Sequence, residues 1–336
     1  MKEKRPKLVQ ELPGFDVLAD VLGTLGLRSR LFCRSDVAAP WVMTFPADNL
    51  AHFHIVERGG AWLEMEGLKA PPALAPGDLV VVGRRNAYRL VDQPGRKGVE
   101  AIQFPPPDPS GRCMLLRQGH GATSVLICGS FAFEEAEDHP LLALLPKVMH
   151  LRGGTSQSNP WLESMSRFLI AEASAMKPGT QTIVSRLTDI LFVQVLRAWL
   201  ADQPDRPNWL SGLNDSRIGP ALALIHERPE EAWTVEMLAA KVGLSRSPFT
   251  VRFTRVVGES PQAYITRVRM QRAARLLRER DASLGQIALK VGYESESSFS
   301  KAFKRQYRKT PGQFRKERHG HLVTNVGRSR EMAEVD

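Results

Sequence analysis

Short apolar runs, each ended by glycine, proline or asparagine, fill the first part of the chain. Runs of this kind are typical of β-strands, because the residues that end them favour turns. Many short strands at close spacing predict a β-sandwich or a barrel. The predicted strands are residues 51–60, 61–67, 78–83, 87–92 and 123–131.

Apolar residues then change to helical spacing. After Asn159, which can cap a helix, and Pro160, which fits a first turn, apolar residues recur at the helical period. A turn at 177–180 and a second apolar helix capped by Thr182 follow, so an antiparallel helix pair is predicted. This pair either packs on its own β domain or forms a subunit interface, and residues 201–209 are a predicted linker.

The last third of the chain contains one pattern twice. GLSRSPFTVRF at 243–253 matches GYESESSFSKAF at 292–303, and the likeness extends over 234–261 and 283–311. In each copy a capping residue precedes a short helix, a glycine that can adopt the left-handed conformation ends it, and a second helix follows. This order predicts two helix-turn-helix units.

The second helix of each copy separates an apolar face from a polar one. The residues predicted to face the core are Phe249, Phe253 and Val257 in the first copy and Phe299, Phe303 and Tyr307 in the second. The opposite faces carry small polar residues and single cations, so they can enter a DNA major groove. They hold Ser247, Thr250, Val251 and Thr254, then Ser297, Ser300, Lys301 and Lys304.

The net charge supports the same interpretation. The 336-residue chain has a formal net charge of +10, and residues 213–320 hold 21 Lys and Arg against 11 Asp and Glu. The whole excess therefore lies in the duplicated segment, which favours a polyanion partner; a merely soluble basic surface is the alternative. An arginine-rich helix over 262–280 joins the copies. The cations predicted to meet phosphates are Arg246, Arg252, Arg255, Arg305 and Arg308.

Three further features of the sequence bear on where the protein resides and on its redox state: the start of the chain, the length of its apolar runs and its cysteines. The chain starts without an apolar leader and holds no apolar run of membrane-spanning length, so a soluble, cytoplasmic and nucleoid-associated protein is expected. Cys33, Cys113 and Cys128 lack the spacing of metal ligands. Buried reduced thiols are the expected state, and a redox sensor is the alternative.

Residues 215–318 resemble the DNA-binding domain of the AraC/XylS family of bacterial transcription regulators. Two stretches, LAAKVGLSRSPFTVRFTRVVGESPQAYITRVRMQRAARLL and IALKVGYESESSFSKAFKRQYRKTPGQFR, are similar to both motifs of that family. The resemblance implies recognition helices near 245–256 and 295–306 in successive major grooves. The base-contacting positions that it implies are Ser247, Thr250, Val251, Glu296, Ser297, Ser300 and Lys301. Many relatives carry Arg where Val251 stands, which favours a contact to a thymine methyl here.

Four basic residues complete the predicted DNA-binding set. They stand on or beside the two outward faces and are Arg246, Arg252, Lys304 and Arg305. The first two belong to the first copy of the repeat and the others to the second. We expect them to contribute affinity through phosphates more than sequence choice.

Residues 13–200 resemble the cupin-type domain found ahead of this DNA-binding domain in one subgroup of the family. Metal cupins use a His-x-His pair, a following Glu and a later His. Here His52 and His54 are present, Glu57 follows too closely, and Tyr88 stands where the later His belongs. The ligand set is therefore incomplete, and no metal or cofactor is expected. Because they stand two positions apart, His52 and His54 are expected to share one face of a strand. His52, His54 and Tyr88 are candidate effector-binding residues; purely structural histidines are the alternative.

Together these observations predict an α+β chain: an N-terminal cupin-like β-barrel, a helical linker and a C-terminal all-α domain with two helix-turn-helix units. The expected domains are 1–135, 136–212 and 213–320, with a disordered tail at 321–336. The favoured function is sequence-specific DNA binding by a transcription regulator that responds to a small molecule. The alternatives are a metal-dependent cupin enzyme fused to a DNA-binding module and a regulator controlled by abundance alone. The expected partners are double-stranded DNA, the effector, RNA polymerase and a second copy of the chain, without any membrane.

Overall fold

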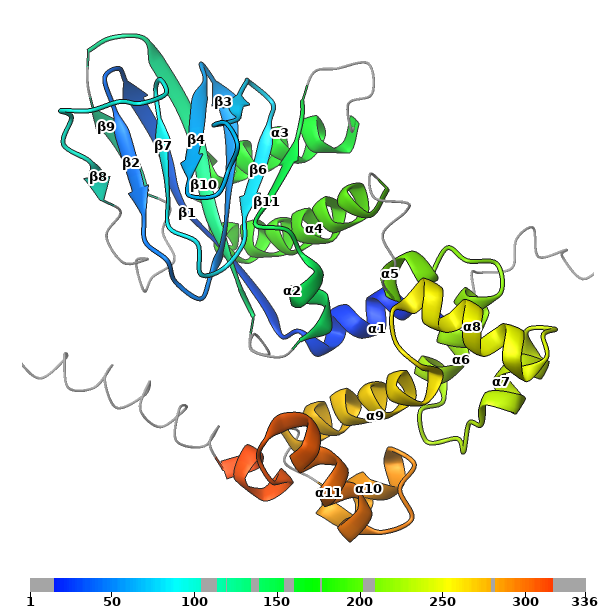
Figure 1. The fold of residues 1–336 in the computed structure, drawn as a ribbon. Helices are drawn as coiled ribbons and strands as arrows, with labels where there is room; N and C mark the ends of the chain where they lie inside the picture. The colour runs from blue at the N-terminus through cyan, green and yellow to red at the C-terminus, as the bar shows by residue number, and fades with distance from the viewer. Residues whose placement is uncertain are drawn as a thin grey trace, which may run out of the picture. The chain divides into compact units, whose positions relative to one another are not determined.

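The structure is a computed structural model, and it divides the chain into two compact units. One unit is Leu25–Gln203, and the other combines Met1–Thr24 with Pro204–Asp336 (Figure 1). The described residues are 15–103, 114–118, 120–133, 139–153, 160–175, 177–201, 209–278 and 282–316. The boundaries expected from the sequence stay predictions, and the predicted tail lies outside the described residues.

Two β-sheets form the centre of the unit Leu25–Gln203. Among the described residues the larger sheet has six strands in the order β11-β6-β3-β10-β1-β9, and the smaller has five in the order β5-β4-β7-β2-β8. The strands are β1 Leu27–Ala38, β2 Val42–Phe45, β3 Ala51–Arg58, β4 Ala61–Met65, β5 Ala73–Leu74, β6 Leu79–Val82, β7 Tyr88–Val91, β8 Ile102–Gln103, β9 Met114–Gln118, β10 Thr123–Phe133 and β11 Val148–Leu151. The predicted β-rich fold is therefore confirmed.

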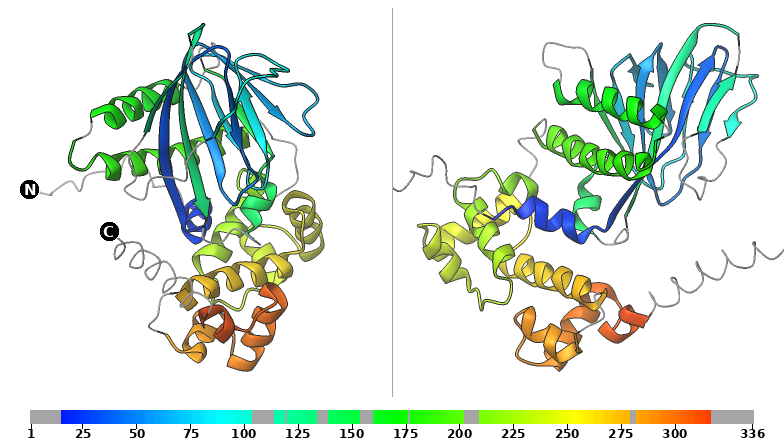
Figure 2. Two further views of the ribbon diagram at one scale, coloured as in Figure 1. Left: turned by 90° about the vertical axis from the view of Figure 1, so that its left-hand side faces the viewer. Right: turned by 180° about the vertical axis from the view of Figure 1, so that it is seen from behind.

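Helices cover one face of the larger sheet. The helices of this unit are α2 Pro140–Leu144, α3 Pro160–Ala175 and α4 Thr180–Ala201. α3 and α4 lie side by side over the sheet (Figure 2), and the Phe192 ring of α4 packs 5.0 Å from the Phe131 ring of β10. The pair thus packs on its own β domain. α4 begins at Thr180, two residues before the predicted cap Thr182, and Asn159 lies outside the described residues.

Alternation along β3 decides which side chains enter the space between the sheets. Phe53 turns toward the helices, where its ring packs 5.0 Å from Phe131. Val56 belongs to the core between the sheets, together with Leu63 and Leu90 from the smaller sheet. His52 and His54 share the face of Val56, because side chains two residues apart lie on the same side of a strand. The sequence prediction that both histidines share one face is confirmed.

The second unit is helical. Its helices are α1 Val17–Thr24, α5 Trp209–Gly212, α6 Ile218–Glu227, α7 Val235–Lys241, α8 Arg246–Val257, α9 Pro261–Arg278, α10 Leu284–Lys290 and α11 Glu296–Tyr307. α7 with α8 and α10 with α11 are the two predicted helix-turn-helix units, and α9 joins them (Figure 1). α9, α10 and α11 share a buried core that includes Met270, Ile287 and Phe303.

The two turns have the same backbone. Gly243 and Gly292 have φ angles of +68° and +76°, which favour glycine because a Cβ atom crowds the left-handed region. In the first turn Leu244 N–H donates to Ala239 O at 2.9 Å, and in the second Tyr293 N–H donates to Ala288 O at 2.9 Å. These bonds span the helix end in the manner of a Schellman motif. The duplication visible in the sequence is therefore a duplication of backbone geometry.

The second helices of the two helix-turn-helix units, α8 and α11, begin with different caps, and the reason is local. The Ser295 hydroxyl accepts a hydrogen bond from Ser298 N–H at 3.2 Å and caps α11. Ser245 stands at the equivalent place before α8, but its side chain makes no cap bond. The residue three positions on is Pro248, which has no N–H to donate. Ser245 is therefore the N-cap residue of α8 by its position and its extended backbone, without a side-chain cap bond.

Candidate nucleic-acid interface

The second helix of the first helix-turn-helix unit, α8, buries one face and exposes the other. Phe249 and Phe253 are fully buried, whereas the side chain of Val251 is 68% exposed. Ser247 is exposed as well. Thr250 is half-buried, and its hydroxyl donates to Arg246 O at 2.9 Å. The outward face is thus small and nearly uncharged, with an apolar isopropyl group as its most prominent feature.

The second helix of the second helix-turn-helix unit, α11, exposes side chains of a different chemistry. Phe299 and Phe303 are fully buried, and the Tyr307 ring packs 4.6 Å from that of Phe303 while staying half-buried. Ser300 is half-buried beside them. The exposed positions on the outer side are Glu296, Ser297, Lys301, Lys304 and Arg305. This face is polar and cationic where the face of α8 is small and apolar.

Arg252 makes a contact inside the unit that the sequence did not indicate. Its Nε and Nη2 atoms donate to both carboxylate oxygens of Asp215 at 3.0 to 3.1 Å. The same carboxylate accepts the backbone N–H groups of Arg217 and Ile218 at 2.9 Å, which fixes the start of α6. Burial alone would raise the pKa of Asp215, but these hydrogen bonds outweigh it and lower the pKa. Arg252 therefore ties α8 to α6.

Arg269 on α9 joins the two helix-turn-helix units. Its guanidinium donates to Pro229 O at 2.8 Å and Glu231 O at 2.7 Å, in the loop before α7. It also donates to Gly292 O at 3.2 Å, in the turn of the second unit. Charged hydrogen bonds of this kind are stronger than neutral ones. The planar guanidinium therefore holds the loop before α7 against the turn of the second unit, a role that its place in an arginine-rich helix did not indicate.

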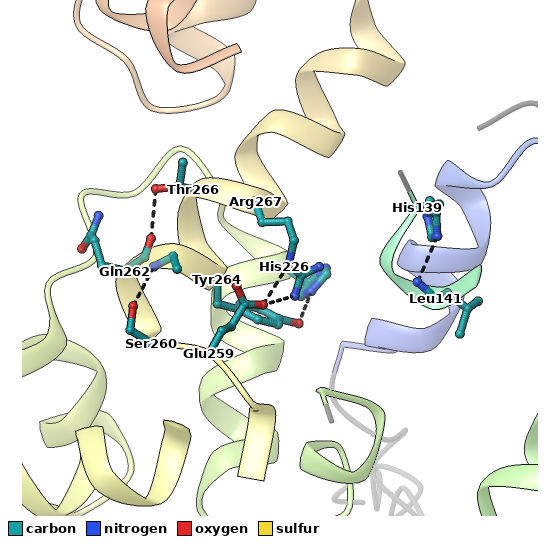
Figure 3. A network of polar contacts seen from close by, with 10 residues as sticks. His139, Leu141, His226, Glu259, Ser260, Gln262, Tyr264, Thr266 and Arg267 are labelled. Atoms are coloured by element: carbon teal, nitrogen blue, oxygen red, sulfur yellow. Dashed lines mark hydrogen bonds and ion pairs between the residues drawn. The ribbon is translucent and has the colours of Figure 1, made fainter. Parts of the chain in front are cut away.

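A buried polar network supports the other side of α9. His226 Nε2 lies 2.8 Å from the Tyr264 hydroxyl, and His226 Nδ1 lies 2.7 Å from Asp20 Oδ2 on α1. Arg267 pairs with Glu259 at 2.6 Å and lies over the Tyr264 ring (Figure 3). Burial raises the pKa of the Tyr264 hydroxyl, so it stays protonated. This network orients α9, which carries the second unit.

In the β-sheet unit, the candidate effector residues form one hydrogen-bonded cluster. The Tyr88 hydroxyl lies 3.0 Å from His52 Nδ1 and 2.6 Å from His54 Nε2. His54 is fully buried, and its Nδ1 lies 3.1 Å from Cys128 Sγ. Burial lowers the pKa of both histidines, so they are neutral at neutral pH. The structure thus brings all three predicted residues together.

These residues do not fit a metal ion. The Tyr88 hydroxyl occupies the point on which His52 and His54 converge. Glu57, the third member of the family pattern, pairs instead with Arg34 at 2.8 Å. Within the described ranges no group of three or more His, Cys, Asp or Glu side chains is arranged to hold a metal. The cluster is a hydrogen-bonded network and not a set of metal ligands.

A cavity of about 580 Å³ opens beside this cluster at the ends of β2, β4 and β7. Tyr88 and Phe45 stack at 4.7 Å on its inner side. The remaining lining residues are Thr44, Glu64, Met65, Glu66, Leu68, Pro71, Ala87 and Arg89. Neither histidine lines it, so Tyr88 is the member of the cluster that a molecule in the cavity would touch.

Fold and surface now define a class of protein: a double helix-turn-helix DNA-binding protein with an attached β-sandwich unit. Residues 16–201 match the family described as "Cupin", and residues 238–317 match "Helix-turn-helix domain". A putative AraC-like transcription regulator of Streptomyces lividans is 35% identical over 306 residues, covering 90% of this chain and 98% of the relative. The chain belongs to the AraC family of transcription regulators.

Further comparisons agree. The HTH-type transcriptional regulator MtrA of Neisseria gonorrhoeae is 33% identical over 266 residues, covering 79% of this chain and 85% of that protein. The DNA-binding domain of AdpA, solved with a target DNA, is 28% identical and covers 32% of this chain and 96% of that chain, with a TM-score of 0.31. As a member of the AraC family, the protein is a DNA-binding transcription regulator. Among the described residues, no helix has the length and apolarity to cross a bilayer.

Proposed function

We propose that α8 and α11 read base edges in successive major grooves, within a regulator that answers to a small molecule. The observation that carries the DNA-reading part is the shared geometry of the two units. Both turns are closed by left-handed glycines, and both reading helices bury a Phe-x3-Phe pair while exposing the opposite face. A slender exposed face on the second helix is what a major groove accepts.

The two faces have different reading chemistry. Val251 offers a methyl-rich surface that suits the C5 methyl group of thymine. Lys301 offers an ammonium group that suits the N7 and O6 acceptors of guanine, and Ser297 lies exposed one turn earlier on the same helix. We assign Ser247, Thr250, Val251, Glu296, Ser297, Ser300 and Lys301 to the base-reading surface. The flanking cations Arg246, Lys304 and Arg305 contribute phosphate contacts.

Arg252 receives a double role in this proposal. Its pairing with Asp215 leaves the side chain 37% exposed, so the guanidinium can still approach a phosphate while it holds α6. Arg246 is freer, because its partner Glu236 is itself more than half exposed and the pair lies in solvent. Exposed ion pairs contribute little to stability. Arg246 is therefore the simpler phosphate ligand of the two.

The Lys301→Ala variant tests the reading role. We expect it to lose preference at particular bases, by about 1–3 kcal/mol for a true base contact. The measurement is selection of preferred sites from a randomised duplex, compared between variant and wild type. Lys290→Ala removes an exposed lysine of α10 and serves as the control. Equal weakening on every sequence would assign Lys301 to the phosphates instead.

For the effector we propose the cavity beside Tyr88. Its wall is largely apolar, with Phe45, Met65 and Leu68, while the Glu64–Arg89 ion pair lines its polar side. Such a composition suits a small, mainly apolar molecule with one polar group. The histidines then act behind the wall, by fixing the Tyr88 hydroxyl, and not as direct ligands.

Filling the cavity tests this proposal. Leu68→Trp should abolish the response to whatever inducer the cell supplies, yet leave DNA binding by the purified protein unchanged. Lys69→Trp adds the same ring at the neighbouring exposed position, which does not line the cavity, and should respond normally. The readout is a reporter placed behind a selected site. A normal response from Leu68→Trp would remove the cavity from the proposal.

RNA polymerase and a second copy of the chain stay predicted partners.

A further inference from the structure

Two cysteines that are far apart in the sequence face each other across neighbouring strands. Cys33 on β1 and Cys128 on β10 are direct partners in the antiparallel register. Residues opposed in this way have Cα atoms about 4.5 to 5.5 Å apart. A disulfide spans Cα separations of about 4.4 to 6.8 Å, so the backbone already meets its main requirement.

Both side chains also lie on the same side of the sheet. Cys33 is 1% exposed and Cys128 is fully buried, and both belong to the core between the two sheets. Both thiols are reduced in this structure. The pair is therefore a single site at the centre of the sandwich.

One of the two thiols has a partner that can take its proton. Cys128 Sγ lies 3.1 Å from His54 Nδ1, and His54 Nε2 lies 2.6 Å from the Tyr88 hydroxyl. In the tautomer protonated on Nε2, His54 accepts at Nδ1 and donates to Tyr88. Cys33 Sγ instead lies 3.3 Å from the Ser35 hydroxyl. A second thiol placed to resolve the first is one feature of redox-sensing cysteines.

We propose that Cys33 and Cys128 are an oxidation-sensitive dithiol, which a small neutral peroxide closes to a cross-strand disulfide. This inference is independent of the proposed effector cavity, since it needs no molecule bound there. It favours the redox alternative that cysteine spacing alone ranked below buried reduced thiols.

The chemistry proceeds in two balanced steps. Cys128 Sγ attacks one oxygen of hydrogen peroxide while its proton passes to His54 Nδ1. The O–O bond breaks, and the departing hydroxide takes that proton to form water, which leaves a sulfenic acid. Cys33 Sγ then attacks the Cys128 sulfur, the S–O bond breaks, and the hydroxide leaves with the proton of Cys33 as a second water. Two electrons pass from the thiols to the peroxide.

Formation of the Cys33–Cys128 disulfide would change the hydrogen bonds of His54, which lies behind Tyr88 at the cavity. Once its sulfur is bonded to Cys33, Cys128 no longer has a thiol proton to share with His54. His54 then keeps its contact with Tyr88 alone, and Tyr88 lines the cavity wall. The oxidation state of the two cysteines would thus affect Tyr88 in the cavity wall through the imidazole of His54.

The test uses full-length protein carrying Cys113→Ser, so that an internal disulfide has one possible pairing. After treatment with hydrogen peroxide, we expect intact mass to fall by two hydrogen atoms and a peptide map to show Cys33 linked to Cys128. Dithiothreitol should restore both thiols. In Cys33→Ser, dimedone should trap a sulfenic acid on Cys128. The map is repeated on the wild type, so the result does not depend on how well a variant folds.

Histidine NMR signals provide the second readout. The His54 signal, identified by its loss in His54→Gln, should shift on oxidation and return on reduction. The proposal fails if both thiols stay alkylatable after peroxide treatment and unfolding, or if the product is an intermolecular or Cys113-linked disulfide. It fails equally if only sulfinic or sulfonic acids form. An unshifted His54 signal in the disulfide form would remove the connection to Tyr88.

Discussion

His54 shows how a single polar side chain is held inside a β-sandwich. Both of its ring nitrogens have partners, Tyr88 and Cys128, so its burial leaves no orphaned polar atom on the ring. The sequence predicted that His52 and His54 share a strand face, since alternation is local. It did not predict Cys128 as a neighbour, because that contact joins residues 74 positions apart and depends on strand register.

Stability should fall in mild acid because of this residue. Burial, and then the nearby His52, hold the pKa of His54 well below 6.5 in the folded state. The unfolded chain gains a proton below pH 6.5 that the folded chain does not. The contribution of His54 is therefore complete above pH 6.5 and is lost as the pH falls from there toward the folded-state pKa. The slope reaches about 1.4 kcal/mol per pH unit for one such group.

Denaturant unfolding between pH 7 and pH 5 measures this effect, with His54→Gln as the comparison. The variant should be less stable at pH 7 but lose less stability on acidification than the wild type. The remaining slope is assigned to His52, whose pKa burial also lowers, against the opposing effect of Asp48. Parallel curves for the two proteins would show that His54 takes up its proton in the folded state.

At the scale of elements, local sequence patterns predicted helices, strands and turns well, but no pattern indicated which distant elements pair. The strand β3 and the turns at Gly243 and Gly292 follow from alternation, capping residues and glycine placement. The strand β1 was missed, because Arg28, Arg30 and Arg34 interrupt its apolar positions and hide a twelve-residue strand. The helix α1 was missed as well, and its contact through Asp20 to His226 spans 206 residues.

The two turn glycines should differ in their tolerance of a methyl group. At Gly292 a Cβ atom would lie 2.7 Å from Glu230 O, a backbone atom, and 2.8 Å from Arg269 Nη2, which is held by its hydrogen bond to Glu231 O. At Gly243 the nearest atom is Arg217 Nη1 at 3.2 Å, the far end of a flexible side chain. Gly243→Ala should cost about 1–2 kcal/mol from the left-handed backbone alone. Gly292→Ala should cost clearly more.

Urea unfolding of the two full-length variants decides this comparison, and each protein is the control for the other. The same samples, tested for DNA binding, should show the greater loss for Gly292→Ala, because Arg269 holds the loop before α7 against the turn of the second unit. Equal destabilisation would mean that the backbone relaxes around residue 292. The three hydrogen bonds donated by Arg269 would then hold that turn less rigidly than their geometry indicates.

At the scale of the whole molecule, two independent features of the sequence indicated which part of the chain binds DNA. The charge excess lies within residues 213–320, and the same segment contains the duplicated pattern. Neither signal could show which arginines serve the fold. Arg252 and Arg269 were indistinguishable from their basic neighbours until their contacts with Asp215 and with the turn carbonyls were seen. The number of cations therefore does not distinguish arginines that hold the fold from those that only face solvent.

The central claim is that two helices of one chain read two adjacent major grooves. Its most direct test is binding to a selected duplex in which each purine in turn is replaced by its 7-deaza analogue, which lacks the N7 acceptor, and each thymine in turn by uracil, which lacks the C5 methyl group. We expect sensitive positions in two clusters about 10 base pairs apart, one helical turn. Lys301→Ala should erase sensitivity in one cluster only, and Lys290→Ala in neither. A single cluster, or loss of both with Lys301→Ala, would contradict the account.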